Sequence, residues 1–466
     1  MFSKYEYSEA RDIPSSRAIP SIDVLRKPYL GMSGGQNGLT LWVFLHNCHI
    51  DEIYLVCHFD INKMQLGPSM STDLATDFET ELQRLFGSEV SLEPLTTEER
   101  MGRRICGVDL TRPLTSHQAQ LIVALLDHYR LVSFAAQDQS RFRLRDLERL
   151  ANHFGAPIPH PKNYANYLSY KKHQVPLQLL PVERQTATLC NQAFPDELRC
   201  RPDADSPAVY TVTNLVNSGP DKQEEVVGSL HWHTDIEFEP VPLSTSMFYV
   251  QAVPTTRQSP TGTWVSPTPR EAGFYHPDSP AELAARRNVL PLNGETAYTD
   301  TLAAYADLPL SEQQQLDKVM VRRRLRLGDP GWLIPLVYTN PRTGAKSLHS
   351  PVWASRGKNI APVEVDGLTD DASREFLDKL EAHVLQPQYR YDHIHRPGDV
   401  TLWSNFATLH NAPPAKSVIN TPEDARLMYR ISCKGDPSYS LPRRDPDNWI
   451  NDNIVPPYRS PTDFIL

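Results

Sequence analysis

The stretch from Arg396 to His410, RPGDVTLWSNFATLH, decides the fold. Its Arg-Pro-Gly tripeptide predicts a turn, because proline fixes φ and glycine permits backbone conformations closed to other residues. The run at 399–403 predicts a strand, and the histidine comes just beyond it. Other short β-like runs, separated by prolines, occur at 244–250, 336–339 and 427–433. Many short strands of this kind predict a β sandwich or a jelly roll.

Helices are expected mainly before these strands. Thr115 and Gln118 have the spacing of a capping box. Behind them, one helical stripe is apolar: Leu121, Ile122, Leu125, Leu126 and Tyr129. A short strand is predicted at 131–134, and a second helix over 144–154 that ends at Gly155. The remainder is expected to be mostly short strands, so the fold class is mostly β with flanking helices.

Composition and charge limit the partners and the compartment. The chain has 466 residues and a formal net charge of -9, without a run of lysine and arginine, so a nucleic acid is not expected as a partner. Six cysteines without a CxxC pair are typical of reduced thiols in a cytoplasmic protein. The most apolar stretch, 39–59, contains histidines and carboxylates, which argues against a membrane span. The net charge does not argue against a small anionic ligand, because the local field of a pocket can oppose it, and homo-oligomerisation stays open.

The chain is expected to have two parts. Residues 1–90 carry a glycine-rich break and little periodicity, and they are predicted to be an N-terminal extension. Residues 91–466 are predicted to form the main domain. The segment that begins at Met70, MSTDLATDFETELQRLFG, has a more regular residue pattern than the residues before it. We therefore also hypothesise that residues 1–69 do not belong to the functional protein.

The segment SLHWHTDIE at 229–237 carries the strongest chemical signal. In an extended backbone, residues two apart point the same way, so His233 and Asp235 can share one metal ion. Two imidazoles and one carboxylate on one face of a metal are the arrangement that non-haem Fe(II) uses in oxygenases. A His-X-Asp pair alone is weak evidence. His410, just beyond the predicted strand at 399–403, supplies the second imidazole.

The predicted strand at 426–432 carries two arginines on one face. Alternation divides its residues into two sets, Arg426, Met428, Arg430 and Ser432 against Leu427, Tyr429, Ile431 and Cys433. Two arginines on one face of a half-apolar strand are poor core material, because a buried guanidinium needs an anionic partner. The strand therefore indicates a site for anions, and the alternative is an exposed face with salt bridges.

Taken together, these motifs resemble the TauD/TfdA (taurine / 2,4-dichlorophenoxyacetate dioxygenase) family over roughly residues 91–437. WHTD at 232–235 is similar to the metal motif of the family, and PGDVTLWSNFATLH at 397–410 to the segment with its distal histidine. GRRICGVDLTRPLTSHQ at 102–118 and HFGAPIPHP at 153–161 resemble its N-terminal signature. GETAYTDTLAAY at 294–305 resembles its GGDT-type cosubstrate motif.

The resemblance implies a double-stranded β-helix core, that is, a cupin-like jelly roll. It implies an Fe(II)- and 2-oxoglutarate-dependent dioxygenase that uses O₂ to oxidise, most often by hydroxylation, an unactivated C–H bond of a small acidic molecule. His233, Asp235 and His410 are then the catalytic metal ligands. Succinate and CO₂ are the coproducts of this reaction.

The resemblance also assigns residues around the metal. Thr296 and Arg426 are expected to hold the distal carboxylate of 2-oxoglutarate. Arg430 is expected to bind the acidic group of the substrate, with His160 nearby. Asn405 matches a residue that the family usually keeps behind the distal histidine.

The chain departs from the family pattern at a few places. Ser404 and Phe406 stand where the family typically has Asp and Arg, which changes the support expected for His410. Ser229 stands where taurine-type enzymes have an Asn near the sulfonate, so taurine is not the expected substrate. The proline-rich stretch 254–291 is predicted to be an insertion, either a lid over the substrate or a surface loop.

Two alternatives compete with this reading. His231 and His233 are also two apart, with Glu237 four residues further on, as in a three-histidine cupin dioxygenase that needs no 2-oxoglutarate. Arg426 and Thr296 argue against that enzyme, because it has no cosubstrate carboxylate to hold. A non-catalytic jelly-roll protein that binds a metal is the other alternative.

A second pair of histidines, His393 and His395, has the same spacing as the metal motif. Because the pair precedes the Arg-Pro-Gly turn, we expect it on a surface strand and not at the metal.

Overall fold

The computed structural model describes residues 30–35, 38–43, 57–59, 70–97, 99–160, 163–165, 167–168, 172, 207–213, 226–227, 231–254, 279–291, 294–355, 360–412, 415–416, 423 and 425–440. The chain divides into two compact units, Met1–Asp73 and Leu74–Leu466. In the first unit, an antiparallel sheet consists of β1 (Leu30–Gly35), β2 (Gly38–Val43) and β3 (Cys57–Phe59). The site residues predicted from the sequence all belong to the second unit.

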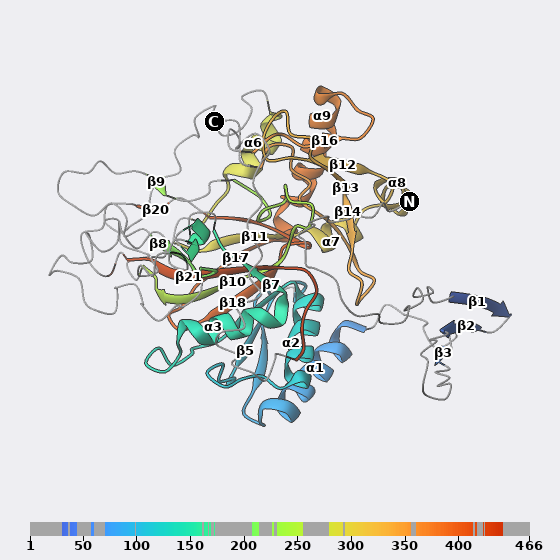
Figure 1. Ribbon diagram of the computed structural model, residues 1–466. Coiled ribbons are helices and arrows are strands. Elements are labelled where there is room, and N and C mark those ends of the chain that lie inside the picture. Colours follow the sequence, from blue (N-terminus) through green and yellow to red (C-terminus); the bar gives the residue numbers. More distant parts are fainter. Residues whose placement is uncertain are drawn as a thin grey trace, which may run out of the picture. The chain divides into compact units, whose positions relative to one another are not determined.

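The second unit contains an eight-stranded sheet (Figure 1). Its strand order is β4 (Ser91–Pro94), β5 (Arg103–Cys106), β6 (Leu131–Phe134), β18 (Val400–Ser404), β10 (Leu243–Ala252), β21 (Leu427–Lys434) and β7 (Ala156–Ile158), and β8 (Tyr210–Thr213) also pairs with β21. All neighbours are antiparallel except β5 and β6. The strands predicted at 131–134, 244–250, 399–403 and 427–433 are confirmed, and they are neighbours in this sheet.

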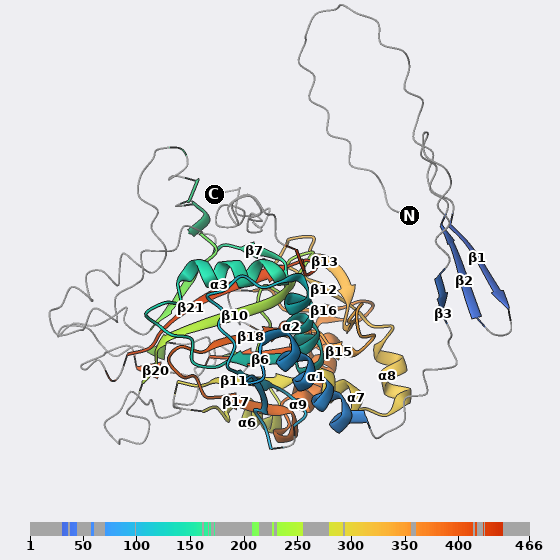
Figure 2. The same ribbon diagram turned by 90° about the horizontal axis from the view of Figure 1, so that it is seen from below.

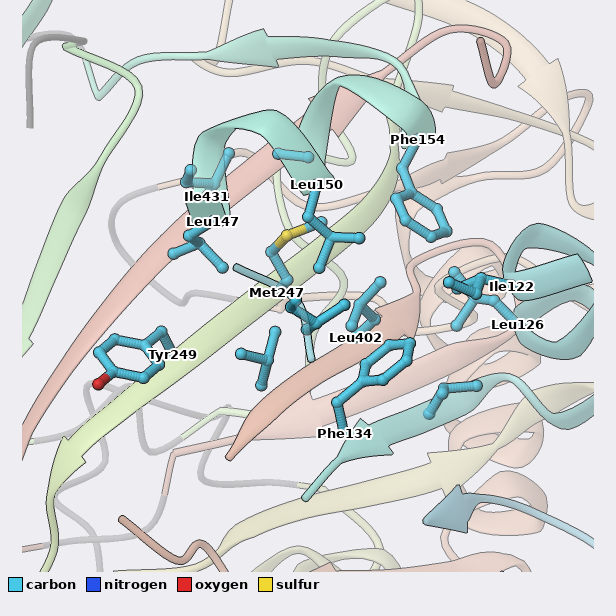
Figure 3. Packing of buried hydrophobic residues seen from close by; sticks show 14 of the residues in the cluster. Ile122, Leu126, Phe134, Leu147, Leu150, Phe154, Met247, Tyr249, Leu402 and Ile431 are labelled. Carbon is cyan, nitrogen blue, oxygen red and sulfur yellow. The ribbon is translucent and has the colours of Figure 1, made fainter. Parts of the chain in front are cut away.

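Helices cover one face of this sheet. They are α1 (Met70–Phe86), α2 (Ser116–Tyr129), α3 (Leu144–Ala151) and the short 3₁₀ helix η2 (Asn152–Phe154). Thr115 and Gln118 form the predicted capping box. Figure 3 shows apolar side chains of α2 and α3 directed at strands β6, β10, β18 and β21. Leu82 of α1 is fully buried in the same cluster, so this helix also belongs to the core.

The helix predicted to end at Gly155 does end there. Gly155 has φ +130°, a conformation that side chains rarely allow. A Cβ added at this position would lie 2.5 Å from the backbone oxygen of Lys434. The chain can therefore enter β7 beside β21 because this residue has no side chain.

A smaller sheet lies on the other face of the large one. Its order is β17 (Arg390–His393), β11 (Thr296–Asp300) and β19 (Thr408–Asn411). Tyr298 of β11 packs with Phe248, Trp403 and Met428 of the large sheet in a buried cluster. Both views show the same sequence of layers, from α3 through the large sheet and the small sheet to α6 and α9, and Figure 1 shows α2 on the same side as α3 (Figures 1 and 2). The two sheets therefore enclose the interior in which the predicted site residues meet.

The second half of the chain contains more helix than the sequence indicated. The helices described there are α6 (Ala281–Asn288), α7 (Thr301–Ala306), α8 (Leu310–Leu316) and α9 (Asp370–Val384). The expectation of mostly short strands was wrong for these segments, because their apolar stripes are brief and bury against neighbouring segments. In α9, for example, Thr369 caps the helix, and Leu377 and Val384 are fully buried. None of the described helices has the length and apolar character that crossing a membrane requires.

The remaining described strands are short. They are β12 (Met320–Arg323) between β13 (Trp332–Pro335) and β16 (Glu364–Val365), the pair β14 (Val337–Thr339) and β15 (Lys346–Leu348), and the pair β9 (Val226–Val227) and β20 (Ala415–Lys416). The 3₁₀ helix η6 (Pro387–Tyr389) leads into β17. The strand predicted at 336–339 is thus confirmed as β14.

Part of the predicted insertion at 254–291 is described. Its C-terminal end forms α6, where Arg287 pairs with Glu381 of α9 at 2.6 Å. All three charged groups around this contact, Arg287, Asp378 and Glu381, are buried. Residues 255–278 lie outside the described residues. Whether the insertion is a lid therefore stays a hypothesis.

Candidate metal centre

His233, Asp235 and His410 come together in the interior. One ligand atom of each lies within 4.8 Å of the others, and all three side chains are buried. Asp235 Oδ1 lies 3.9 Å from His233 Nε2 and 3.7 Å from His410 Nε2. A pair of imidazoles and one carboxylate oxygen thus converge on a common point, which is the donor set that a non-haem iron site requires.

Backbone hydrogen bonds set this geometry across a long separation in the sequence. The amide of His233 donates to the oxygen of His410 at 3.1 Å, and the amide of His410 donates to the oxygen of His233 at 2.9 Å. His410 itself belongs to β19 and pairs with Tyr298 of β11. The two imidazoles therefore stand side by side on a β bridge, with ring centroids 4.3 Å apart.

The carbonyl of His231 orients the first imidazole. His233 Nδ1 lies 2.8 Å from the backbone oxygen of His231, so Nδ1 carries the proton and Nε2 keeps its lone pair for a metal. Glu237 accepts a hydrogen bond from Ser355. Within the described part of the chain, neither the His231 imidazole nor the Glu237 carboxylate belongs to the metal-ligating group. This geometry does not favour the three-histidine cupin.

Asp235 is held by a chain of polar side chains from the large sheet. Ser246 of β10 donates to Asp235 Oδ2 at 2.9 Å, and the Asn405 amide donates to Ser246 at 3.0 Å. Trp403 Nε1 in turn donates to Asn405 Oδ1 at 3.2 Å. Asn405 was expected behind the distal histidine. It supports the carboxylate of Asp235 instead, through Ser246, because it faces β10. These bonds leave Asp235 Oδ1 directed at the two imidazoles.

We expect the Ser246→Ala substitution to weaken metal binding by roughly 10- to 100-fold, since a supporting hydrogen bond fixes the orientation of a ligand. Calorimetric titration of the metal-free protein with Mn(II) would measure this. Ser432→Ala is the matched control, because Ser432 contacts Ser246 at 2.9 Å and lies one step further from Asp235. Equal losses in both variants would contradict the role assigned to Ser246.

Arg430 lies beside the metal residues. Its Nη1 is 3.1 Å from Asp235 Oδ1, and its side chain is 25% exposed. Tyr210 of β8 is its register partner, and the guanidinium lies 6.0 Å from that ring centroid. The exposed side chain of His160 stacks on the ring of Tyr210, and the two ring centroids are 5.0 Å apart. The structure thus brings together the two residues expected at the substrate, and it adds Tyr210, which no sequence motif indicated.

Arg426 and Thr296 lie deeper. Arg426 is 5% exposed, its Nε contacts Met428 Sδ at 3.3 Å, and burial lowers its pKa to about 10. The carboxylate of Glu295, the residue before Thr296 on β11, raises the pKa of the same guanidinium and so opposes the effect of burial. Thr296 Oγ1 lies 2.8 Å from His395 Nε2. A poorly solvated cation close to this strand is a strong attraction for an anion.

The expectation that His393 and His395 lie on a surface strand was wrong. Both are 1% exposed, whereas Ile394 between them is 50% exposed. His393 Nε2 contacts Thr401 at 3.0 Å, and burial lowers the pKa of His393 to about 3. The imidazoles point inward because hydroxyl groups of Thr401 and Thr296 satisfy them there. His395 therefore supports Thr296, and that role could not be seen from the spacing of the pair.

Tyr298 was also missed. It is fully buried on β11, and its ring centroid lies 6.2 Å from that of His410 and 5.7 Å from that of Trp403. The alternation of side chains places it on the same face as Thr296, two residues earlier. The sequence shows this two-residue alternation, so Tyr298 could have been recognised as a neighbour of the site.

Two of the departures from the family pattern lie in the described residues. The ring of Phe406 stacks on Tyr338 with centroids 3.9 Å apart, so Phe406 is a packing residue. Ser404 accepts a hydrogen bond from Thr408 through its backbone oxygen at 2.8 Å. Ser229 lies outside the described residues.

The family model "Taurine catabolism dioxygenase TauD, TfdA family" matches residues 91–432. A pentalenolactone F synthase of Streptomyces arenae is 31% identical over 172 residues, which cover 31% of this chain and 54% of the relative. An (S)-phenoxypropionate/alpha-ketoglutarate-dioxygenase of Sphingobium herbicidovorans is 27% identical over 259 residues, which cover 55% of this chain and 75% of the relative. The chain spans about half the length of most relatives that it matches. One solved structure, a taurine dioxygenase from Burkholderia xenovorans, has a TM-score of 0.43 at 20% identity, covering 74% of this chain and 90% of its own.

Proposed function

The chain belongs to the TauD/TfdA family, and on that premise we propose that it is an Fe(II)- and 2-oxoglutarate-dependent dioxygenase. The reaction we propose is hydroxylation of an unactivated C–H bond in a small acidic molecule, with release of succinate and CO₂. The observation that carries this proposal is the buried convergence of His233, Asp235 and His410. Their donor atoms fit a non-haem iron, which with 2-oxoglutarate would supply the oxidising power for O₂ chemistry.

The chain's own residues would position this chemistry. His233 and His410 offer imidazole nitrogens, and Ser246 keeps Asp235 in the orientation of a ligand. We assign the distal carboxylate of 2-oxoglutarate to Arg426 and Thr296, because both are buried near the metal residues and the guanidinium can form paired, charge-assisted hydrogen bonds. Burial would also keep water away from the reacting atoms.

The substrate side of the site is assigned to Arg430, Tyr210 and His160. Arg430 is the half-buried cation closest to Asp235, and its partial exposure leaves room for contact with a molecule from outside. A guanidinium there favours a carboxylate or sulfonate on the substrate. Tyr210 and His160 form an aromatic wall beside it, which supports a small organic acid as the substrate.

The proposal extends to the architecture. We infer that the large sheet and the β17-β11-β19 sheet form the double-stranded β-helix of the family, since both sheets enclose the metal residues. The dioxygenase domain would comprise 91–466, with 254–291 as an insertion, and α1 of the preceding segment 1–90 packs into its core. A cytoplasmic location is supported by the free thiols of Cys106 and Cys433.

We expect the purified protein with Fe(II) to release succinate from 2-oxoglutarate, and one class within a panel of carboxylates, amino acids and sulfonates to stimulate that release. In Arg430→Gln, the stimulation should fall at least about tenfold through weaker substrate binding, while slow substrate-independent turnover persists. Chromatographic measurement of succinate would show both effects. The absence of 2-oxoglutarate consumption by the parent protein would refute the proposed reaction. An unchanged response of Arg430→Gln would refute the role of that arginine.

A further inference from the structure

Among the residues that the structure describes, the hydroxyl group of Tyr298 is buried without a hydrogen-bond partner. The residue is 0% exposed, and its phenol oxygen has no hydrogen-bond partner within the part of the chain that is described. A buried hydroxyl without a hydrogen bond is costly and uncommon in proteins, and its presence indicates a group that it meets in another state of the molecule. The question is which group that would be.

The strand register shows where the side chain points. Tyr298 stands directly opposite His410 in the β11–β19 ladder, and directly opposite residues have side chains on the same face. Its neighbours Ala297 and Leu409 pack into a different apolar cluster on the outer side of the sheet. Tyr298 therefore faces the interior, on the side of the proposed iron ligand.

Charged groups from two parts of the site act on the phenol of Tyr298. Burial raises its pKa, and the nearby carboxylate of Asp235 raises it further, whereas the guanidinium groups of Arg426 and Arg430 oppose this. Asp235 belongs to the metal group, and Arg426 is the residue assigned to the distal carboxylate. The hydroxyl thus lies in the field of both ends of the proposed cosubstrate site. Thr296, the other residue assigned to that carboxylate, is two residues earlier on the same face.

We propose that the Tyr298 hydroxyl donates a hydrogen bond to a carboxylate oxygen of bound 2-oxoglutarate. The inference rests on the proposed function, since it takes the same cosubstrate. A phenol is a good donor, and a hydrogen bond to an ionised oxygen in a buried site is stronger than one between neutral groups. Tyr298 would then be a third anchor for the 2-oxo acid, along with Arg426 and Thr296. Its unsatisfied state would be the consequence of serving a ligand.

The test uses Tyr298→Phe in the full chain. We expect the Kd for 2-oxoglutarate, measured by calorimetry with Mn(II) in place of iron, to rise about tenfold. The melting temperature of the ligand-free variant should be unchanged or higher, because the removed hydroxyl has no hydrogen-bond partner in the described part of the chain. A purely structural tyrosine would behave in the opposite way. Tyr305→Phe is the matched control, since its hydroxyl donates to Asp317 at 2.6 Å, away from the site.

Tyr305→Phe should lower the melting temperature and leave the Kd for 2-oxoglutarate unchanged. A second titration with 2-oxovalerate, which has a methyl group in place of the distal carboxylate, identifies the acceptor. If Tyr298→Phe weakens both ligands, the hydroxyl serves the carboxylate next to the metal; if it weakens only 2-oxoglutarate, it serves the distal one. Unaltered binding of 2-oxoglutarate by Tyr298→Phe, or a fall in its melting temperature like that of the control, would overturn the inference. Failure of the parent protein to bind 2-oxoglutarate would overturn the proposed function as well.

Discussion

Asp235→Ala is expected to abolish product formation and most Fe(II) binding. The carboxylate contributes the one anionic ligand atom of the group, between the imidazoles of His233 and His410. Its removal should therefore cost more than the roughly 10- to 100-fold that follows the loss of a supporting hydrogen bond. Calorimetric titration with Fe(II) under anaerobic conditions would measure the binding, and succinate release would measure the reaction.

The control for this experiment is His231→Ala. Its imidazole lies outside the metal group, and the contact to His233 comes from its backbone oxygen, which alanine retains. We therefore expect His231→Ala to bind iron almost as the parent protein does. Asp235→Asn is a useful second variant, because an amide can still accept the hydrogen bond from Ser246 and so protects the fold. Metal loss in His231→Ala together with metal retention in Asp235→Ala would establish the three-histidine cupin instead.

Arg426→Gln is expected to raise the KM for 2-oxoglutarate at least about tenfold, some 1.4 kcal/mol, with a smaller change in substrate affinity. The guanidinium is buried, so a carboxylate that loses this partner remains poorly paired in a site with little water. Initial rates at varied 2-oxoglutarate concentration, with substrate saturating, would give the value.

Arg430→Gln is the matched comparison for Arg426→Gln. Arg430 lies in β21 and Arg426 directly precedes this strand, on the same face. The four residues between their positions correspond to about 13 Å along an extended strand, so two anions can be bound at once. Arg430 contacts Asp235 and Tyr210, whereas Arg426 contacts Met428. The two substitutions should therefore affect different ligands. If both raise the KM for 2-oxoglutarate equally, the division of roles between the arginines is wrong.

Some of the fold was predictable because the relevant forces act over a few residues. The alternation at 427–433 predicted two faces, and the structure has Leu427, Tyr429, Ile431 and Cys433 in the core under the helices. Met428 and Ser432 lie on the opposite face. The capping box at Thr115 was equally local, since both of its hydrogen bonds join residues three apart. Periodicity and capping depend on backbone geometry, so a single sequence carries them.

The helices of the second half were harder to predict. In α9, Leu377 and Val384 form an apolar stripe. The stability that this stripe contributes depends on the cluster that covers it, which includes Val321 and Leu348 from distant segments. Local propensity is a weak indicator when burial against distant residues supplies most of the stability of a helix. For the same reason, His393 and His395 could not be assigned to the interior before their partners Thr401 and Thr296 were known.

By itself, the sequence determined the family, the mostly β class and the residue types of the metal site. The order of the motifs was sufficient for this, because His233, Asp235 and His410 are chemically distinctive and their neighbours repeat a family pattern. Only the tertiary structure decided which groups support them: Ser246 and Asn405 behind Asp235, Tyr210 beside Arg430, and the buried hydroxyl of Tyr298. These roles depend on which strands become neighbours in a sheet, and a contact such as that between Asn405 and Ser246, 159 positions apart, leaves no periodicity along the chain.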